Sequence, residues 1–140
     1  MQIIECQTDA QILLTLPVMR QLRPQVEEPA YLPAVRAIQA EAGRLIAALH
    51  NDQCRGCALF RQQTRLNGGA ILYVDDLVTA AQYRSQGVGH ALLQWIEAEA
   101  RRLSIPICSL DSGLHREGAH RFYVREGYSI AAFHFRKPVI

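Results

Sequence analysis

The chain has 140 residues, 49% of them hydrophobic, and a formal net charge of +2. This length matches one domain that buries roughly two-thirds of its unfolded surface, so we expect a single domain over residues 1–140. The charge is too small to predict a nucleic-acid-binding face, and no apolar run approaches the ~20 residues needed to span a membrane. Residues 1–10 lack the layout of a secretory signal, which predicts a cytoplasmic protein.

The first half of the chain predicts two helices around an acidic stretch. A helix should begin at Thr8–Asp9, because either side chain can accept a hydrogen bond from the first amides of a helix. Pro17 should kink or split this helix, which ends before Pro24. We expect an irregular acidic stretch over residues 24–33 and a second helix from there to Gly43.

Strands and helices follow one another in the rest of the chain. The runs 44–50 and 54–62 are separated by three residues, which is short enough for a hairpin. The first expected strand opens at Ile3 and Ile4 and ends at Thr8–Asp9. The other expected strands are 44–50, 54–62, 70–79, 105–110 and 128–137, and the expected later helices are 87–103 and 118–126. This order predicts an α/β fold with a mixed sheet and helices on both faces.

The four cysteines are expected to be reduced and packed among apolar side chains. They are Cys6, Cys54, Cys57 and Cys108. Cys54 and Cys57 have C-x-x-C spacing, but no second Cys or His pair follows at the spacing of a zinc site. We therefore predict no metal site and interpret this pair as strand packing.

Two glycines stand at the junction between the strand 70–79 and the helix 87–103. The junction residues are Arg84, Ser85, Gln86, Gly87, Val88, Gly89 and His90. A glycine-containing loop ahead of a long helix can turn backbone N–H groups toward an anion, and the helix N-terminus adds about half a positive charge. The spacing is not G-x-G-x-x-G and there is no Walker lysine, so the pattern favours a pyrophosphate held without a metal. A simple tight turn explains the glycines equally well.

Residues 84–89 resemble the acetyl-CoA-binding motif of the GCN5-related N-acetyltransferase family, Gln/Arg-x-x-Gly-x-Gly/Ala. Residues 76–79 resemble the strand ahead of that loop, and residues 110–113 and 119–128 resemble the family's downstream strand and helix. Two motifs in this order, about thirty residues apart, are far more specific than either alone. The chain departs from the family pattern at three positions, where proline, glycine and asparagine are common: Ala81, Ser85 and Arg116.

The resemblance implies a mixed, mostly antiparallel central sheet of six to seven strands with helices on both faces. It also implies a splayed pair of parallel strands, 71–79 and 105–110, at the cofactor cleft. Acetyl-CoA is the implied co-substrate. The implied cofactor-binding residues are Leu77, Val78 and Thr79 for the pantetheine arm, residues 84–90 for the pyrophosphate, and Arg116. One N–H group at the end of the first strand would stabilise the thioester oxyanion.

Tyr123 is the candidate general acid. The thiolate that leaves coenzyme A, whose thiol has a pKa near ~8.5, benefits from a proton that a phenol of pKa ~10 can supply. The resembling family has a tyrosine at this place in F-Y-x-x-x-G, here residues 122–127. An aromatic side chain that packs the helix on the sheet is the alternative interpretation.

The attacking amine must lose a proton, so a carboxylate near it is expected. We favour Asp75 as this base, and we expect Asp75 and Asp76 to point to opposite faces of their strand. The candidate substrate-binding residues are Glu27, Glu28, Tyr31, Asp76 and His120. For each carboxylate, a solvated or capping role remains the alternative.

These observations predict transfer of an acetyl group to a primary amine by direct attack in a ternary complex. Residues 119–128 look like those of aminoalkylphosphonate N-acetyltransferases and of small polyamine or histone-type acetyltransferases, so a polyamine or an aminoalkylphosphonate is favoured. Two alternatives stay open: acetylation of protein lysines or N-termini, and a non-catalytic acyl-CoA-binding sensor. An unpaired edge on the last strand would also favour a homodimer.

Overall fold

In the computed structural model, which describes residues 1–140, the chain divides into two units, Met1–Ser109 and Leu110–Ile140. The strands are β1 (Gln2–Glu5), β2 (Gly43–His50), β3 (Gln53–Arg65), β4 (Gly69–Thr79) and β5 (Ile107–Leu110). The helices are α1 (Asp9–Leu14), α2 (Leu16–Leu22), α3 (Glu28–Ala40), α4 (Val88–Arg102) and α5 (Glu117–Arg125), with a 3-10 turn, η1 (Ala81–Tyr83). None of the helices combines the length and the apolar character that a membrane crossing requires.

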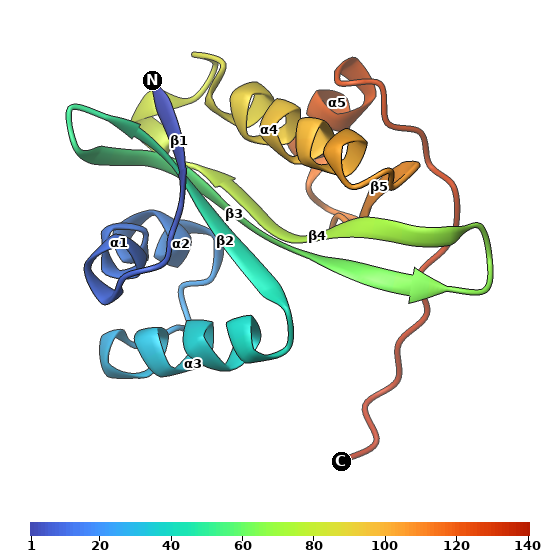
Figure 1. The fold of residues 1–140 in the computed structure, drawn as a ribbon, viewed down its shortest axis with the longest axis horizontal. Coiled ribbons are helices and arrows are strands. Elements are labelled where there is room, and N and C mark those ends of the chain that lie inside the picture. The colour runs from blue at the N-terminus through green and yellow to red at the C-terminus, as the bar shows by residue number, and fades with distance from the viewer. The chain divides into compact units, whose positions relative to one another are not determined.

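A mixed five-stranded sheet in the order β1-β2-β3-β4-β5 forms the centre of the first unit (Figure 1). Each of the first four strands pairs antiparallel with the next, and the chain reaches β5 through α4. Helices α1, α2 and α3 lie on one face of this sheet, and α4 lies on the other. The predicted α/β fold with helices on both faces is therefore confirmed.

The prediction of six to seven strands is wrong, because residues 128–137 form no strand. These residues have no regular secondary structure, and large side chains among them are exposed, Phe133 at 85% and Phe135 at 91%. Their alternating apolar pattern indicates only that they suit a half-buried pleated surface. A strand also needs a neighbouring strand, and this segment pairs with none. The homodimer expected through this strand stays a prediction.

The first helical segment divides as its proline predicts. Thr8 caps α1 in a capping box with Gln11: the Gln11 N–H donates to Thr8 Oγ1 (3.2 Å), and the Thr8 N–H donates to Gln11 Oε1 (3.0 Å). Helix α1 ends at Leu14, and α2 begins at Leu16 with Pro17 in its first turn. Pro17 has no N–H to continue the first helix, but it is well suited to begin a second one.

The second helix begins earlier than predicted. Helix α3 starts at Glu28, so most of the stretch 24–33 that was expected to be irregular is helical. Pro29 lies in the first turn, where a missing backbone N–H removes no hydrogen bond. Pro33 lies inside the helix and removes one, which burial of Tyr31 and Val35 against the sheet offsets.

Each of the two long strands contains one extra residue. In β3 this residue is Arg55, since Cys54 pairs with Leu49 and Gly56 pairs with Ala48. A bulge shifts the alternation of side chains by one position. As a result, Cys54 and Cys57 both join the same buried cluster although they are three residues apart.

In β4 the extra residue is Asp75, since Leu59 pairs with Asp76 and Phe60 pairs with Val74. The prediction that Asp75 and Asp76 point to opposite faces is wrong for this reason. Asp76 is hydrogen-bonded to Arg23 at the end of α2, and Asp75 to Arg61, which also lies 3.9 Å from Glu41 at the end of α3. Both carboxylates therefore lie on the face of the sheet that α1–α3 cover. Alternation by two residues applies only where a strand has no bulge.

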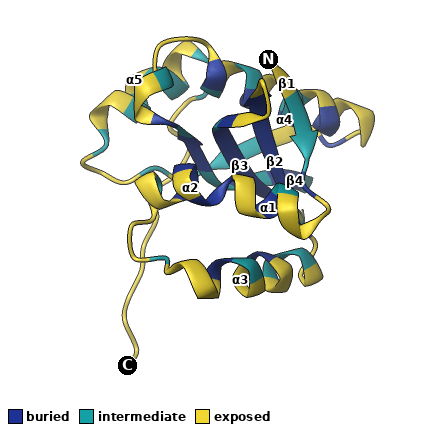
Figure 2. Ribbon diagram, turned by 90° about the vertical axis from the view of Figure 1, so that its left-hand side faces the viewer, coloured by how far each residue is buried: buried dark blue, intermediate teal, exposed yellow.

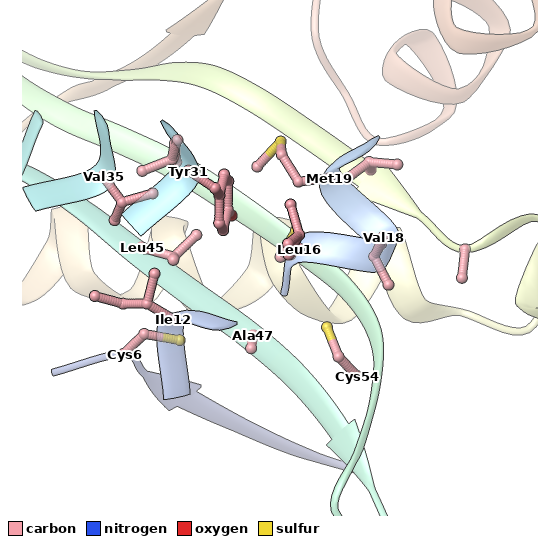
Figure 3. Close-up of a cluster of buried hydrophobic side chains, with 14 of the residues drawn as sticks. Cys6, Ile12, Leu16, Val18, Met19, Tyr31, Val35, Leu45, Ala47 and Cys54 are labelled. Atoms are coloured by element: carbon pink, nitrogen blue, oxygen red, sulfur yellow. The ribbon is translucent and has the colours of Figure 1, made fainter. Parts of the chain in front are cut away.

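The sheet is buried on both faces along β2 and β3, which form the dark centre of Figure 2. The core under α1–α3 joins apolar residues of these helices to Leu45 and Ala47 of β2, together with the thiols of Cys6 and Cys54 (Figure 3). On the other face the Phe60 ring contacts the Trp95 ring of α4 edge-on, with 6.1 Å between centroids. All four cysteines are free thiols.

Candidate active site

The loop between η1 and α4 combines two left-handed residues with an uncapped helix N-terminus. Ser85 (φ 62°) and Gly87 (φ 82°) are both left-handed, and residues 84–87 are exposed. Gly87 is the N-cap of α4, and no side chain caps the helix. The first N–H groups of a 15-residue helix therefore point toward the loop together with the positive end of its dipole. Arg84 adds a full positive charge to this position.

The predicted pyrophosphate residues divide between the loop and the helix. Arg84, Ser85, Gln86 and Gly87 form the exposed loop, and Val88, Gly89 and His90 form the first turn of α4. Val88 is only 2% exposed, so its side chain belongs to the core and only its backbone can contact a ligand. The arrangement can bind a phosphate group through backbone N–H groups without a metal ion.

The end of β4 leads through Ala80 and η1 into this loop. Leu77, Val78 and Thr79 pair with Ala58, Cys57 and Gly56 of β3, and β5 adjoins the other side of β4. The side chains of Leu77 and Val78 are buried. Leu77 and Val78 can therefore contact a ligand only through backbone groups, as the predicted contact with a pantetheine arm requires, whereas Thr79 is half-buried.

Both strand carboxylates are ion-paired with arginines. Asp75 Oδ2 accepts a hydrogen bond from Arg61 Nε (2.8 Å), and Asp76 Oδ1 accepts one from Arg23 Nε (2.7 Å). The hydrogen bond to Asp75 raises the pKa of Arg61. The Asp76 side chain is 15% exposed and that of Asp75 is 29% exposed. If either carboxylate accepts a proton from the substrate, it does so while it is paired with an arginine.

The acidic residues predicted to bind a cationic substrate lie at the start of α3. Glu27 is the N-cap residue and Glu28 lies in the first turn, and both are exposed. Tyr31, predicted with them to bind the substrate, is only 3% exposed, and its hydroxyl is 2.6 Å from Thr15 Oγ1. Burial raises the pKa of Tyr31. The Tyr31 side chain thus belongs to the core.

The second unit contains the remaining predicted residues. Tyr123 lies on α5, with its ring 5.4 Å from that of Phe122 and 6.1 Å from that of Tyr128, centroid to centroid. Burial raises the pKa of Tyr123, and the charge of Arg116 offsets part of this effect. His120 Nε2 is 2.7 Å from the Gly113 carbonyl oxygen, so it helps to hold the turn before α5. Arg116 is the N-cap residue of α5.

Sequence reasoning missed the arginines around these groups. Arg23 and Arg61 pair with the two strand carboxylates, and Arg55 stacks on Tyr83 with 4.3 Å from Cζ to the ring centroid. The contacts of Arg23 and Arg61 join segments far apart in the chain, so no short motif contains them. The Arg55 contact depends on the bulge in β3, for which the sequence has no signal.

Comparison with known proteins identifies the family. A family model described as acetyltransferase (GNAT) family matches residues 14–128. The chain is 37% identical to the uncharacterized N-acetyltransferase YhdJ of Bacillus subtilis (strain 168) over 125 residues, which are 88% of each chain. It is 36% identical to the aminoalkylphosphonate N-acetyltransferase of Salmonella typhimurium over 93 residues, which are 66% of this chain and 60% of that enzyme.

Solved structures agree on the fold. A probable acetyltransferase superimposes with a TM-score of 0.85 at 17% identity, over 100% of this chain and 99% of that one. AAC(6')-Iy in complex with a bisubstrate analog superimposes with a TM-score of 0.83 at 15% identity, over 98% of each chain. The family model covers most of the chain and the Bacillus relative is similar over 88% of it, so the chain belongs to the acetyltransferase (GNAT) family of acetyl-CoA-dependent N-acetyltransferases.

Proposed function

We propose that the protein transfers the acetyl group of acetyl-CoA to the primary amine of a small molecule, by direct attack of the amine in a ternary complex. The observation that supports this most is the uncapped N-terminus of α4 behind a loop with two left-handed residues. Beyond its chain neighbours, no heavy atom lies within 4 Å of the position of a Cβ on Gly87, so the loop is uncovered at this residue. Arg84 to His90 bind the pyrophosphate, and Arg116 adds a further contact with the cofactor.

The end of β4 orients the reacting thioester. The backbone of Leu77, Val78 and Thr79 pairs with the pantetheine arm as an added strand would, which needs no side chain. One N–H group of this segment stabilises the oxyanion that forms when the amine attacks. A contact of this class contributes about 3–4 kcal/mol in comparable acyl-transfer sites.

Tyr123 donates a proton to the departing thiolate. Its raised pKa keeps the phenol protonated at neutral pH, which is the form that a general acid requires. Asp75 accepts the proton of the substrate ammonium group through water, and Asp76, Glu27 and Glu28 attract its positive charge.

Three of the four cysteines, Cys6, Cys57 and Cys108, have raised pKa values and support direct attack over an acetyl-cysteine intermediate. Cys6, Cys54 and Cys57 are buried in the core. Burial raises the pKa of Cys6 to about 12 and also raises that of Cys108. A thiol with a raised pKa is a poor nucleophile at neutral pH, because the thiolate is the reactive form.

For the acceptor we propose a polyamine or an aminoalkylphosphonate. The Salmonella relative is named for aminoalkylphosphonates. The exposed Glu27 and Glu28 suit a cationic amine, whereas the guanidinium groups of Arg23 and Arg61 suit a phosphonate if they exchange partners. A thiol-release assay with both amine classes and with lysine or N-terminal peptides separates the possibilities. Turnover only on peptides would overturn the small-molecule acceptor, and acetyl-CoA binding without any turnover would support a sensor.

The variant Tyr123→Phe tests the general acid. We expect kcat to fall by about 10²-fold with little change in the Kd for acetyl-CoA, because only the proton donor is lost. Tyr128→Phe is the matched control, since it removes the same hydroxyl from the ring next to Tyr123. Equal kcat values for Tyr123→Phe and the wild type would remove Tyr123 from the mechanism.

A further inference from the structure

We propose that Arg55 is a positioning residue for acetyl-CoA: with its neighbour Gly56 it anchors the two ends of the loop 84–87. The inference rests on the proposed function, since it takes this loop as the pyrophosphate site. Arg55 and Gly56 lie at the bulge of β3, and Gly56 pairs with the predicted site residue Thr79 of β4. No family motif in the sequence includes them.

Arg55 contacts the upstream end of the loop through both its backbone and its side chain. Its carbonyl oxygen accepts a hydrogen bond from the Ala80 N–H (2.8 Å), just before η1. Its guanidinium stacks on the ring of Tyr83, the residue that precedes the loop, at 4.3 Å. Arg55 Nε is buried and has no hydrogen-bond acceptor, so stacking on Tyr83 is the contact that orients the guanidinium.

Further contacts hold Tyr83 and η1 in place. The Tyr83 hydroxyl donates a hydrogen bond to Gln53 Oε1 (2.8 Å), so the ring is held at its edge while Arg55 covers its face. The Ala81 N–H donates to Gln21 Oε1 of α2 (2.8 Å). Arg55 is the bulge residue and has no partner in the β2–β3 ladder. The bulge changes the direction of its side chain, which allows the guanidinium to lie over the Tyr83 ring.

Gly56 contacts the downstream end of the loop. A Cβ on Gly56 would lie 2.6 Å from Val88 Cγ1 and 2.9 Å from the Val78 carbonyl oxygen, both too close for any other residue. Val88 is the first residue of α4 and follows the N-cap Gly87 directly. The absence of a side chain at Gly56 therefore determines how closely the start of α4 approaches the sheet.

The loop thus spans two anchors on adjacent residues of one strand. Between these anchors, Ser85 and Gly87 have left-handed backbone conformations. Without the anchors, the loop would also adopt other backbone conformations. A loop that is ordered before binding avoids the entropy cost of ordering when the ligand binds. Loss of the Arg55 contact should therefore weaken acetyl-CoA binding while chemistry at saturating acetyl-CoA proceeds as before.

The test is the Kd for acetyl-CoA, measured by calorimetry, in Arg55→Met and Arg55→Lys. We expect Arg55→Met to raise the Kd about three- to tenfold with kcat at saturation within about twofold. Arg55→Lys keeps a cation over the ring and should restore most of the affinity. Arg44→Met is the matched control, since Arg44 is also a strand arginine stacked on aromatic rings, at 5.1 Å from Phe60 and 5.7 Å from Trp95.

A double-mutant cycle with Tyr83→Leu shows whether Arg55 acts through the ring. If it does, the double variant Arg55→Met/Tyr83→Leu binds acetyl-CoA no more weakly than the weaker single variant. The proposal is overturned if Arg55→Met binds as the wild type does, if Arg44→Met loses as much affinity, or if the two effects simply add. A wild-type protein that does not bind acetyl-CoA would overturn the proposed function and this inference together, whereas the other outcomes affect the inference alone.

Discussion

Gly87 is the residue on which the shape of the loop depends most directly. It adopts φ 82°, and no atom lies near the position of its missing Cβ. Gly87→Ala therefore introduces backbone strain and no clash. We expect a loss of about 1 kcal/mol in the free energy of unfolding, measured by urea denaturation, together with a rise of several-fold in the KM for acetyl-CoA.

Gly68 offers a control that matches Gly87 in conformation but lies in the hairpin turn before β4. Its φ is 81°, and the space around its Cβ position is also empty. Gly68→Ala should lose about the same stability with no change in the KM for acetyl-CoA. A KM that rises equally in both variants would mean that stability, and not the loop, accounts for the effect.

At the scale of secondary-structure elements, the end of α3 is strained. Ala42 follows the C-cap residue Glu41 and has φ 67°, the left-handed conformation that glycine adopts at little cost. Ala42→Gly should therefore stabilise the protein by about 0.5–1 kcal/mol. The midpoint of urea denaturation measures this change.

At Ala40, two residues earlier in the chain, a change to glycine should destabilise the protein instead. Ala40 is the last residue of α3, so Ala40→Gly should cost up to about 1 kcal/mol through lower helix propensity. Both positions are exposed, and both substitutions remove one methyl group. A destabilising Ala42→Gly would show that the observed backbone angle at residue 42 is not a source of strain.

The sequence predicted elements where the signal was local. The short gap between β2 and β3 predicts a hairpin, which the structure has, and its turn consists of Asn51 and Asp52, both with positive φ. Thr8 and Pro17 likewise set the limits of α1 and α2. The bulges at Arg55 and Asp75 were not predictable, because an extra residue in a ladder depends on the neighbouring strand.

For the whole molecule, the sequence predicted the α/β class and the glycine loop before α4, but not the fate of residues 128–137. The spacing of residues along the sequence indicates which of them share a helix or a strand. It does not indicate which side chains from distant segments contact one another. The partners of Asp75 and Asp76 are of this second kind. The roles of Tyr123 and Asp75 remain predictions for the same reason.

A charge network joins the sheet to the end of α4. Glu99 accepts hydrogen bonds from Arg102 (2.6 Å and 2.9 Å) and from Arg44 of β2 (2.7 Å), and Arg44 also pairs with Glu5 of β1. The Glu99 side chain is 10% exposed. The two guanidinium groups, that of Arg102 first, lower the pKa of Glu99 from its ordinary 4.5 to about 2.

This network predicts how stability changes with pH. A carboxyl whose pKa is lower in the folded state stabilises the fold above its ordinary pKa, and this contribution is lost as the pH falls toward the folded-state value. The wild type should therefore lose about 1–3 kcal/mol between pH 4.5 and pH 2 through Glu99. In Glu99→Gln this pH-dependent contribution to the free energy of unfolding is absent. The variant is therefore less stable than the wild type at pH 7, and the stabilities of the two proteins converge near pH 2.

Glu97→Gln is the control on the same helix, since Glu97 lies 3.8 Å from the exposed Arg101. Urea denaturation of the three proteins at several pH values measures the difference, and parallel pH profiles for Glu99→Gln and the wild type would contradict the prediction.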